Sequence, residues 1–407
     1  MRLLGVFEKN YKEMFMLQEK NLLFLKEKEL INNNFENYEL IKNRDISIKT
    51  EDIEGEGIFN FRYGPITGGV ADAGVFNIKT YGERILAVDI DPSYKKRNME
   101  NFIKGLEINK AIPLVESVCA NFAFSHSTAF LRAVEDALNI QTDEFTKRVR
   151  IIGVELERIY NHLYVILKLS KGASQNVLTS HLESLFEETL RINKAISNSR
   201  FLKNLNGLVI RNNRLNNLDY AKDKINYIKN KFQELYEHSL ESWNFIDRIY
   251  KTATLTQNKA LEIGVTGPTL RATGSNEDLR QYEHLYENLD IQTQTNGDSL
   301  SRMIVRAKEI INSCDIILNQ IDKISNIKIK QKTHKISSGM GLGYCESPSG
   351  IVAYFIELKD SKVSDIYIST PSVFGFKAFA ESLIGYIFTD FSFAYDSFGV
   401  NFADCAR

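Results

Sequence analysis

Residues 146–169 read TKRVRIIGVELERIYNHLYVILKL, and this stretch indicates the fold class most directly. Its apolar residues recur at steps of three and four, the spacing that places side chains on one face of an α-helix. That face consists of Val149, Ile152, Leu156, Ile159, Leu163 and Ile166. A long helix with one apolar face predicts packing against other helices in a bundle.

Two stretches further along the chain predict long helices as well. Residues 220–250 are polar on one side and contain neither Gly nor Pro. Residues 298–323 begin with Asp298, a residue type favoured at helix N-caps. Their apolar stripe consists of Met303, Ile304, Ala307, Ile310, Ile311, Cys314, Ile317 and Ile321. We therefore expect a bundle of long helices at the core of the molecule.

Strand-like patterns lie on both sides of the helical region. From residue 58 the chain alternates apolar and polar residues around the turn YGE at 81–83, which predicts an antiparallel hairpin. GIVAYFIELKD at 350–360 predicts a strand near the C-terminus. The expected fold class is α+β, mainly α, with small antiparallel β elements at both ends. Residues 1–55 are charged and Asn-rich and predict an appendage or linker, so 56–407 is the main predicted domain.

Composition limits the classes of function. Of the 407 residues, 43% are hydrophobic and 25% charged, and the formal net charge is −1. This balance is typical of a globular protein and gives no electrostatic reason to expect nucleic acid as a partner. No window approaches the roughly 18 apolar residues of a membrane span. The four cysteines form no CxxC pair, so neither a zinc motif nor a disulfide framework is indicated. We expect a cytoplasmic chain.

The segment ESVCANFAFSHSTAF, residues 116–130, contains Cys119 and His126. Seven residues are two helical turns, so both side chains could lie on one face. One thiol and one imidazole are too few for a zinc site, which takes three or four protein ligands. An ordinary buried thiol is the alternative.

Two further sets of polar residues have open interpretations. Glu155, Arg158 and His162 lie beside the apolar stripe, and could form a surface ion pair or a polar strip facing a cavity. Arg271 lies in the glycine-containing loop VTGPTLRATG. It could clamp an anion, pair with a buried carboxylate, or bond nearby carbonyl groups.

Taken in order, the segments resemble the large subunit of membrane-bound, energy-converting NiFe hydrogenases, including the hydrogenase subunit of formate hydrogenlyase. They also resemble the related quinone-site subunit of respiratory complex I. The resemblance extends from about residue 58 to the last residue. It rests on RYGPITGGVADAGVFNIKTYGE, ESVCANFAFSHSTAFLRAVEDALNI, GVELERIYNHL, GPTLRATG, GDSLSRMIVRAKEI, GYCESPSG and SFGVNFADCAR.

The resemblance implies a cleft built from two segments far apart in the sequence. In the hydrogenases each segment carries a CxxC, and the four thiolates hold nickel and iron. Here Cys119 matches the first ligand, whereas Phe122, Asn401 and Asp404 stand at the other three positions. A phenyl ring has no lone pair to donate, and an amide and a carboxylate are not soft ligands. We therefore expect no metal on this chain and no hydrogen turnover.

The complex I relative binds quinone with a histidine in a GPxHP loop and a tyrosine from another segment. Thr67 replaces that histidine here, and Phe130 lies where an aromatic hydroxyl would be useful. The resemblance predicts that the cleft is lined by Cys119, His126 and Asp404 as catalytic candidates and by Thr67, Arg271 and Asn401 as substrate-binding candidates.

By resemblance, the chain is an oxidoreductase subunit, NADH:quinone oxidoreductase-like or hydrogenase-like, of a membrane-associated complex that couples electron transfer to ion translocation. The implied partners are an iron–sulfur small subunit, whose cluster faces the cleft, and antiporter-like membrane subunits. They would hold the chain on the cytoplasmic side of the inner (cell) membrane. Quinone is one candidate ligand. Two alternatives stay open, a non-catalytic coupling subunit and a hydrogenase with a mononuclear metal at Cys119, His126 and Asp404.

Overall fold

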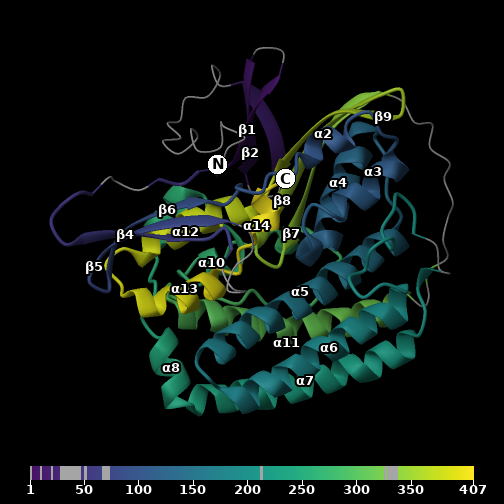
Figure 1. Cartoon of the computed structure of the whole chain (residues 1–407). Helices are drawn as coiled ribbons and strands as arrows, with labels where there is room; N and C mark the ends of the chain where they lie inside the picture. The colour runs from purple at the N-terminus through teal and green to yellow at the C-terminus, as the bar shows by residue number, and fades with distance from the viewer. Residues whose placement is uncertain are drawn as a thin grey trace.

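The long helices α5 (Glu144–Gly172) and α11 (Ser299–Ile324) lie side by side through the middle of the molecule (Figure 1). α6 (Asn176–Ser197) packs on α5, and α7 (Leu218–Glu241) packs on both α6 and α11. The predicted helical bundle is therefore confirmed. The computed structural model describes residues 2–9, 12–19, 22–27, 47–49, 53–66, 74–210, 214–324, 327 and 338–407.

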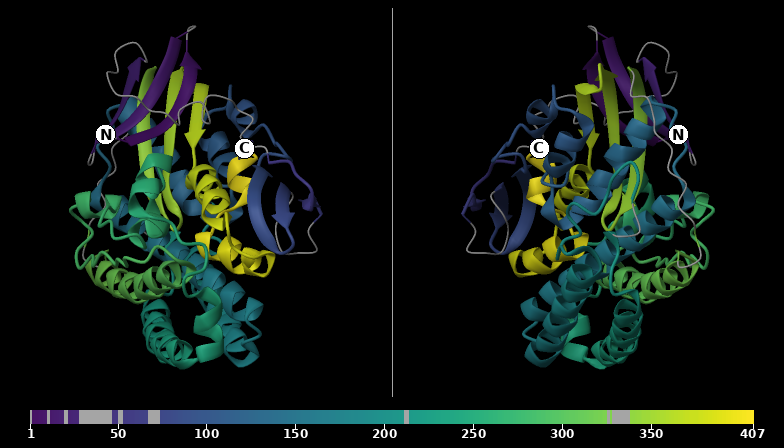
Figure 2. Two further views of the ribbon diagram at one scale, coloured as in Figure 1. Left: turned by 90° about the vertical axis from the view of Figure 1, so that its left-hand side faces the viewer. Right: turned by 90° about the vertical axis from the view of Figure 1, so that its right-hand side faces the viewer.

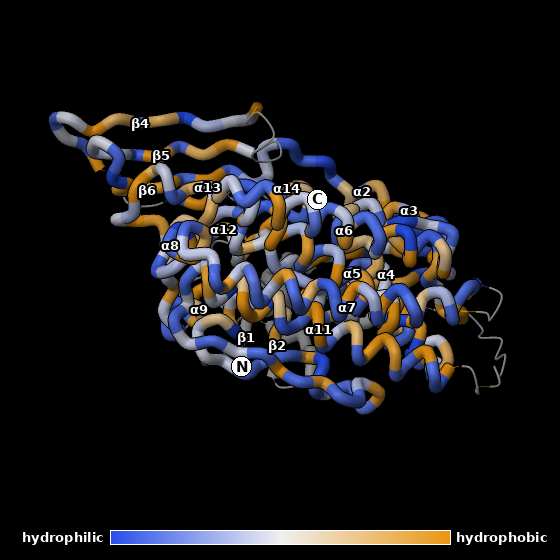
Figure 3. The backbone as a smooth tube through the Cα atoms, turned by 90° about the horizontal axis from the view of Figure 1, so that it is seen from below, coloured by the Kyte–Doolittle hydropathy of each residue, from blue (hydrophilic) through white to orange (hydrophobic). Residues whose placement is uncertain are grey.

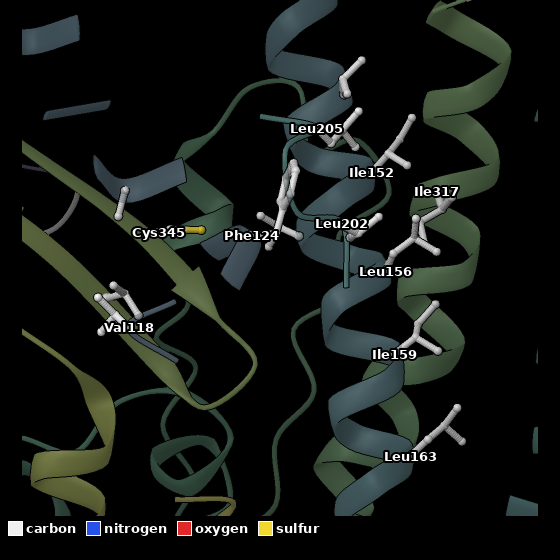
Figure 4. Close-up of a cluster of buried hydrophobic side chains, with 14 of the residues drawn as sticks. Val118, Phe124, Ile152, Leu156, Ile159, Leu163, Leu202, Leu205, Ile317 and Cys345 are labelled. Atoms are coloured by element: carbon white, nitrogen blue, oxygen red, sulfur yellow. The ribbon is translucent and has the colours of Figure 1, made fainter. Parts of the chain in front are cut away.

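The apolar stripe of α5 forms the centre of the main hydrophobic core. Ile152, Leu156, Ile159 and Leu163 are all buried and point toward α11, where Ile317 lies (Figure 4). Along the long helices, hydrophobic and hydrophilic stretches of the chain alternate, as their amphipathic sequences require (Figure 3).

Capping residues set where the two central helices begin. The carboxylate of Asp143 accepts a hydrogen bond from the backbone N–H of Thr146 at 2.9 Å, at the start of α5. Asp298 does the same for Ser301 at 2.8 Å, at the start of α11. The N-cap predicted at Asp298 is thus confirmed.

The helix predicted over residues 220–250 is not continuous. α7 ends at Glu241, Ser242 is extended (φ −77°, ψ 92°), and a separate short helix α8 (Trp243–Ile249) follows. The bend lets Phe245 and Ile249 reach the core, where both are fully buried. Burial of these two side chains overrides the local preference for a single helix.

The predicted hairpin is present and belongs to a three-stranded antiparallel sheet. β5 (Val75–Tyr81) and β6 (Arg84–Asp91) are joined by a tight turn in which Gly82 has φ +59°. β4 (Ile58–Tyr63) pairs with the other edge of β5. This sheet lies at one side of the molecule (Figure 1).

A second antiparallel sheet lies near the C-terminal part of the chain. It consists of β7 (Gly339–Ser347), β8 (Gly350–Lys359) and β9 (Lys362–Ser369), with β8 in the middle. β8 is the strand that the sequence predicts, and α4 (Ala123–Ala137) packs against β7 and β8. The expected class, mainly α with small antiparallel sheets, is confirmed.

Residues near the N-terminus form a third sheet, from β1 (Arg2–Lys9), β2 (Lys12–Glu19) and β3 (Leu22–Glu27). Sequence reasoning expected only an appendage or linker over 1–55. The sheet lies beside β7–β9 (Figure 2), and Met16 packs with Ile351 in one apolar cluster. The domain boundary at residue 55 stays a prediction.

Three helices follow β9, where the sequence indicated no helix. They are α12 (Pro371–Leu383), α13 (Phe391–Phe398) and α14 (Phe402–Cys405). Their aromatic residues pack with the β5–β6 hairpin in a separate core. Among the described residues, no helix is long and apolar enough to cross a membrane.

Candidate functional site

Two segments that are far apart in the sequence meet between α5 and the C-terminal helices. Cys119 directly precedes the short helix η2 (Ala120–Phe122), which leads into α4. Asn401 directly precedes α14, and its side-chain oxygen accepts a hydrogen bond from the N–H of Ala403 at 2.9 Å. Each segment thus enters a helix at the point where the resemblance places the cleft.

The side chain of Arg97 joins these two segments. Its Nη2 donates hydrogen bonds to the backbone carbonyls of Val118 and Ala403. Its Nη1 donates to the carbonyl of Ser117 at 3.0 Å, and its backbone N–H donates to the carbonyl of Ala406 at 2.9 Å. Sequence reasoning missed Arg97, because one arginine in the polar stretch DPSYKKRNME gives no signal of its own.

The predicted catalytic candidates are brought together. His126 Nε2 lies 3.0 Å from Asp404 Oδ1, and His126 Nδ1 lies 2.8 Å from the hydroxyl of Tyr354. All three side chains are fully buried. Asp404 Oδ2 also accepts a hydrogen bond from the N–H of Ser372 at 3.4 Å. Sequence reasoning missed Tyr354, because an aromatic residue within a strand is most simply a core residue.

Cys119 lies beside this group as a neutral thiol. Burial, and then the nearby carboxylate of Asp404, raise the pKa of Cys119 well above its usual value. The same two causes raise the pKa of Cys405, which is also buried.

The donor set does not fit a nickel–iron centre. Of the four ligand positions that the resemblance implies, only Cys119 carries sulfur, and Phe122 is packed at 2% exposure. Asp404 is engaged by His126, and Asn401 caps α14. Among the described residues, no three His, Cys, Asp or Glu side chains are grouped to hold a metal ion. Both ring nitrogens of His126 face hydrogen-bonding partners, so a mononuclear site there has no geometric support.

A small pocket adjoins these ligand positions. Its volume is ≈ 100 Å³. Phe122 and Asn401 line it, and Tyr164, which is 41% exposed, places it at the surface. The other lining residues are Asn121, Asn161, Val165, Lys168, Arg306, Ser349, Tyr395, Asp396, Gly399 and Val400. Most of these carry polar groups, which suits a small polar ligand better than an aromatic ring.

Arg271 lies in a buried network of charges and not in the pocket lining. Its Nη2 lies 2.8 Å from Glu309 Oε1, and its Nη1 lies 3.1 Å from both Glu346 Oε1 and Asp278 Oδ2. All four side chains are at most 3% exposed. Of the interpretations that the sequence left open, pairing with buried carboxylates is the one observed. The substrate-binding role of Arg271 stays a prediction.

Glu155, Arg158 and His162 belong to the same network, and neither of the two interpretations from sequence describes them. All three are fully buried. Arg158 pairs with Glu155 at 3.2 Å, and His162 Nε2 lies 2.9 Å from Glu309. Burial, above all, lowers the pKa of His162 to about 3. A neutral imidazole at this position can donate from Nε2 to Glu309 while Nδ1 accepts from Arg306.

A buried carboxylate holds the start of α4. Glu157 accepts hydrogen bonds from the backbone N–H groups of Phe124 at 2.7 Å and Ser125 at 3.0 Å. Burial raises the pKa of Glu157 to about 7. Sequence reasoning did not identify Glu157. Thr67, the remaining substrate-binding candidate, lies outside the described residues.

Comparison with known proteins supports the resemblance. The family described as "Respiratory-chain NADH dehydrogenase, 49 Kd subunit" matches residues 184–339. Membrane-bound hydrogenase subunit alpha of Pyrococcus furiosus is 28% identical over 319 residues, covering 72% of this chain and 74% of that protein. Formate hydrogenlyase subunit 5 of Escherichia coli is 25% identical, and the alignment covers 70% of this chain and 52% of that protein.

An NADH-quinone oxidoreductase subunit of Carboxydothermus hydrogenoformans is 27% identical over 81% of this chain and 94% of its own length. In fold, the chain is similar to one from the membrane-bound sulfane sulfur reductase, described as an archaeal respiratory membrane complex. That comparison has a TM-score of 0.78 at 20% identity and covers 86% of this chain and 99% of the other. The resemblance predicted from the motifs is thus confirmed, and this chain is similar over most of its length to subunits of membrane-bound hydrogenase, formate hydrogenlyase and NADH-quinone oxidoreductase.

Proposed function

We propose that this chain is the large-subunit-like component of a membrane-associated oxidoreductase complex of the hydrogenase-4 and complex I type. The complex couples electron transfer to ion translocation and does not turn over hydrogen. One observation carries the proposal. The two segments that would form a nickel–iron site meet as the resemblance requires, yet three of the four ligand positions hold Phe122, Asn401 and Asp404.

The partners follow from the same resemblance. An iron–sulfur small subunit would supply electrons from a cluster facing the cleft, so the chain needs no cofactor of its own. Antiporter-like membrane subunits would hold it peripherally on the cytoplasmic side of the cell membrane. The names of two relatives, membrane-bound hydrogenase subunit alpha and formate hydrogenlyase subunit 5, support the membership of a multi-subunit complex at a membrane.

The group of His126, Asp404 and Tyr354 is our candidate for proton transfer to a quinone or another acceptor. A two-electron reduction of a quinone consumes two protons along with the electrons. A histidine between a carboxylate and a phenol can exchange a proton with either neighbour. Cys119 and Asn401 would shape the cleft around this group.

The alternative is a non-catalytic coupling subunit that transmits conformational change within such a complex. Two observations favour it. Phe122 fills a former ligand position at 2% exposure, and His126 and Asp404 are fully buried against each other. Both hypotheses predict the same partners, so the experiment must separate assembly from electron transfer.

The test starts from the affinity-tagged full chain, purified from its own cells with mild detergent. Mass spectrometry is expected to find an iron–sulfur small subunit and antiporter-like membrane proteins. Hydrogen uptake with a dye acceptor is expected to be absent, and nickel is expected below stoichiometric amounts. Stoichiometric nickel with hydrogen uptake would contradict the proposal, and so would the lack of membrane partners.

An Asp404→Asn variant then separates the two hypotheses. It keeps the shape of the side chain and removes its charge, so assembly is expected to survive. If the buried group transfers protons, quinone reduction by the assembled complex is expected to fall by roughly tenfold or more. An unchanged rate in a fully assembled variant would favour the non-catalytic alternative.

A further inference from the structure

Arg306 is a buried cation without a carboxylate in direct contact among the described residues. It lies on α11 and is 1% exposed. Its Nη1 donates to the carbonyl of Pro348 at 3.1 Å and lies 3.2 Å from Nδ1 of His162, and its Nη2 donates to the carbonyl of Phe398 at 2.8 Å. These partners are all neutral. Guanidinium groups do not lose their proton in proteins, so the charge has to be balanced from elsewhere.

Two of the five N–H donors of Arg306 have no hydrogen-bond partner among the described residues, namely the Nε–H and the second N–H of Nη2. The Nε–H is buried and makes no hydrogen bond to any described atom, and Arg306 lines the small pocket beside Phe122 and Asn401. An unsatisfied buried donor costs roughly 1–3 kcal/mol, and more when it belongs to a charged group. Gly399 keeps this arrangement possible, because a Cβ there would lie 2.7 Å from Arg306 Nη2.

The pocket lining carries one more positive than negative charge. It contains the cations Arg306 and Lys168 and one carboxylate, Asp396. Lys168 and Asp396 form an ion pair at 2.6 Å, so the charge of Arg306 is left over within the lining. Beyond the lining, Glu309 lies near enough to interact with Arg306, but its oxygens already bond to Arg271 and His162.

We propose that the pocket binds a small monovalent anion beside the guanidinium group of Arg306. The volume of ≈ 100 Å³ corresponds to about three water molecules at roughly 30 Å³ each, which suits an anion of about three or four heavy atoms. The amides of Asn121 and Asn401 line the same space and can donate further hydrogen bonds. This inference does not require that the chain belongs to a complex.

The test is titration calorimetry of the full chain in chloride-free buffer at pH 7, with sodium nitrate as the probe. Saturable binding of one nitrate per chain is expected. Sodium sulfate, which is larger and divalent, is expected to bind at least about tenfold more weakly. No saturable binding up to about 100 mM nitrate, or equally tight binding of sulfate, would overturn the proposal.

Variants locate the site. Arg306→Lys is expected to weaken nitrate binding by roughly tenfold or more, because Lys lacks the planar guanidinium that can donate several hydrogen bonds at once. Arg302→Lys is the matched control, since Arg302 is also buried on α11, bonds to carbonyl and hydroxyl oxygens, and does not line the pocket. Equal loss of binding in both variants would contradict the assignment.

A second variant keeps the proposal testable if a buried Arg→Lys change prevents folding. Asn121 is only half-buried, so Asn121→Asp is expected to fold while placing a negative charge at the pocket. Repulsion between that carboxylate and the anion is expected to abolish nitrate binding. Unchanged affinity in a folded Asn121→Asp chain would place the nitrate elsewhere and overturn the proposal.

Discussion

At the scale of single residues, Glu157 shows how burial makes stability depend on pH. Its pKa is raised from 4.5 to about 7 by burial. The folded state therefore holds a proton that the unfolded state releases above about pH 4.5. Because the pKa is higher in the folded state, the free energy of unfolding falls as the pH rises from 4.5, the pKa of the unfolded state, through about 7, the pKa of the folded state. This pKa difference corresponds to at most about 3 kcal/mol of stability.

This pKa can be tested by measuring the free energy of unfolding of wild type and Glu157→Gln in urea at pH 5 and pH 7.5. Wild type is expected to lose stability relative to the variant over this range, by up to about 3 kcal/mol. Gln does not titrate, so the variant controls for every other ionisable group. A stability difference between the two proteins that is the same at both pH values would contradict the raised pKa.

At the scale of elements, glycines on β7 let the strand approach α4. A Cβ at Gly339, Gly341 or Gly343 would overlap the backbone carbonyl oxygens of Ala137, Ala133 and Ala129, respectively. Two strand residues rise roughly 6.6 Å and four helical residues roughly 6.0 Å, so alternate strand positions meet successive helical turns. The spacing GMGLG in the sequence is thus explained by a helix that lies directly on the strand.

Gly341→Ala is expected to destabilise the protein by about 1–3 kcal/mol or more, because β7 and α4 must separate to admit the methyl group. Urea unfolding of the full chain measures this. Gly207→Ala is the matched control, because the nearest atom to a Cβ there is 3.6 Å away. That change is expected to alter stability by less than about 1 kcal/mol. Equal destabilisation by Gly341→Ala and Gly207→Ala would show that the close approach of β7 to α4 does not account for the effect.

Prediction from sequence worked for elements that have a strong periodic signal. The apolar stripe of residues 146–169 and the cap at Asp298 both predicted helices that are present. It failed at Ser242, where the helix breaks so that two side chains can enter the core. It also missed α12 and α13, because both are short and mostly buried, so that only Lys377 and Glu381 in α12 and Ser392 and Asp396 in α13 mark a polar face.

At the scale of the whole molecule, Arg97 connects parts of the chain that are about 300 residues apart. It bonds to Val118, 21 residues away on one side of the candidate site, and to Ala403, 306 residues away on the other. Arg97→Lys keeps the charge and loses the planar fork that reaches both carbonyls. The expected loss is about 1–3 kcal/mol in urea unfolding.

A second readout is specific to this role. Limited proteolysis is expected to cleave the C-terminal segment faster in the Arg97→Lys variant, because α14 loses a tie to the body of the protein. Lys95→Ala, at an exposed position two residues earlier, is expected to change neither measurement. Unchanged proteolysis in Arg97→Lys would show that the two segments are held together by other contacts.

The sequence by itself determined the helical bundle, the hairpin and the family resemblance. Periodicity and residue identity are local properties, so they can be recognised without coordinates. Only the tertiary structure decided which polar residues meet. His126 lies against Tyr354, more than 200 residues away, and Arg271 lies in a charge network instead of the pocket. Such contacts depend on the packing of distant elements, and no spacing in a single sequence encodes them.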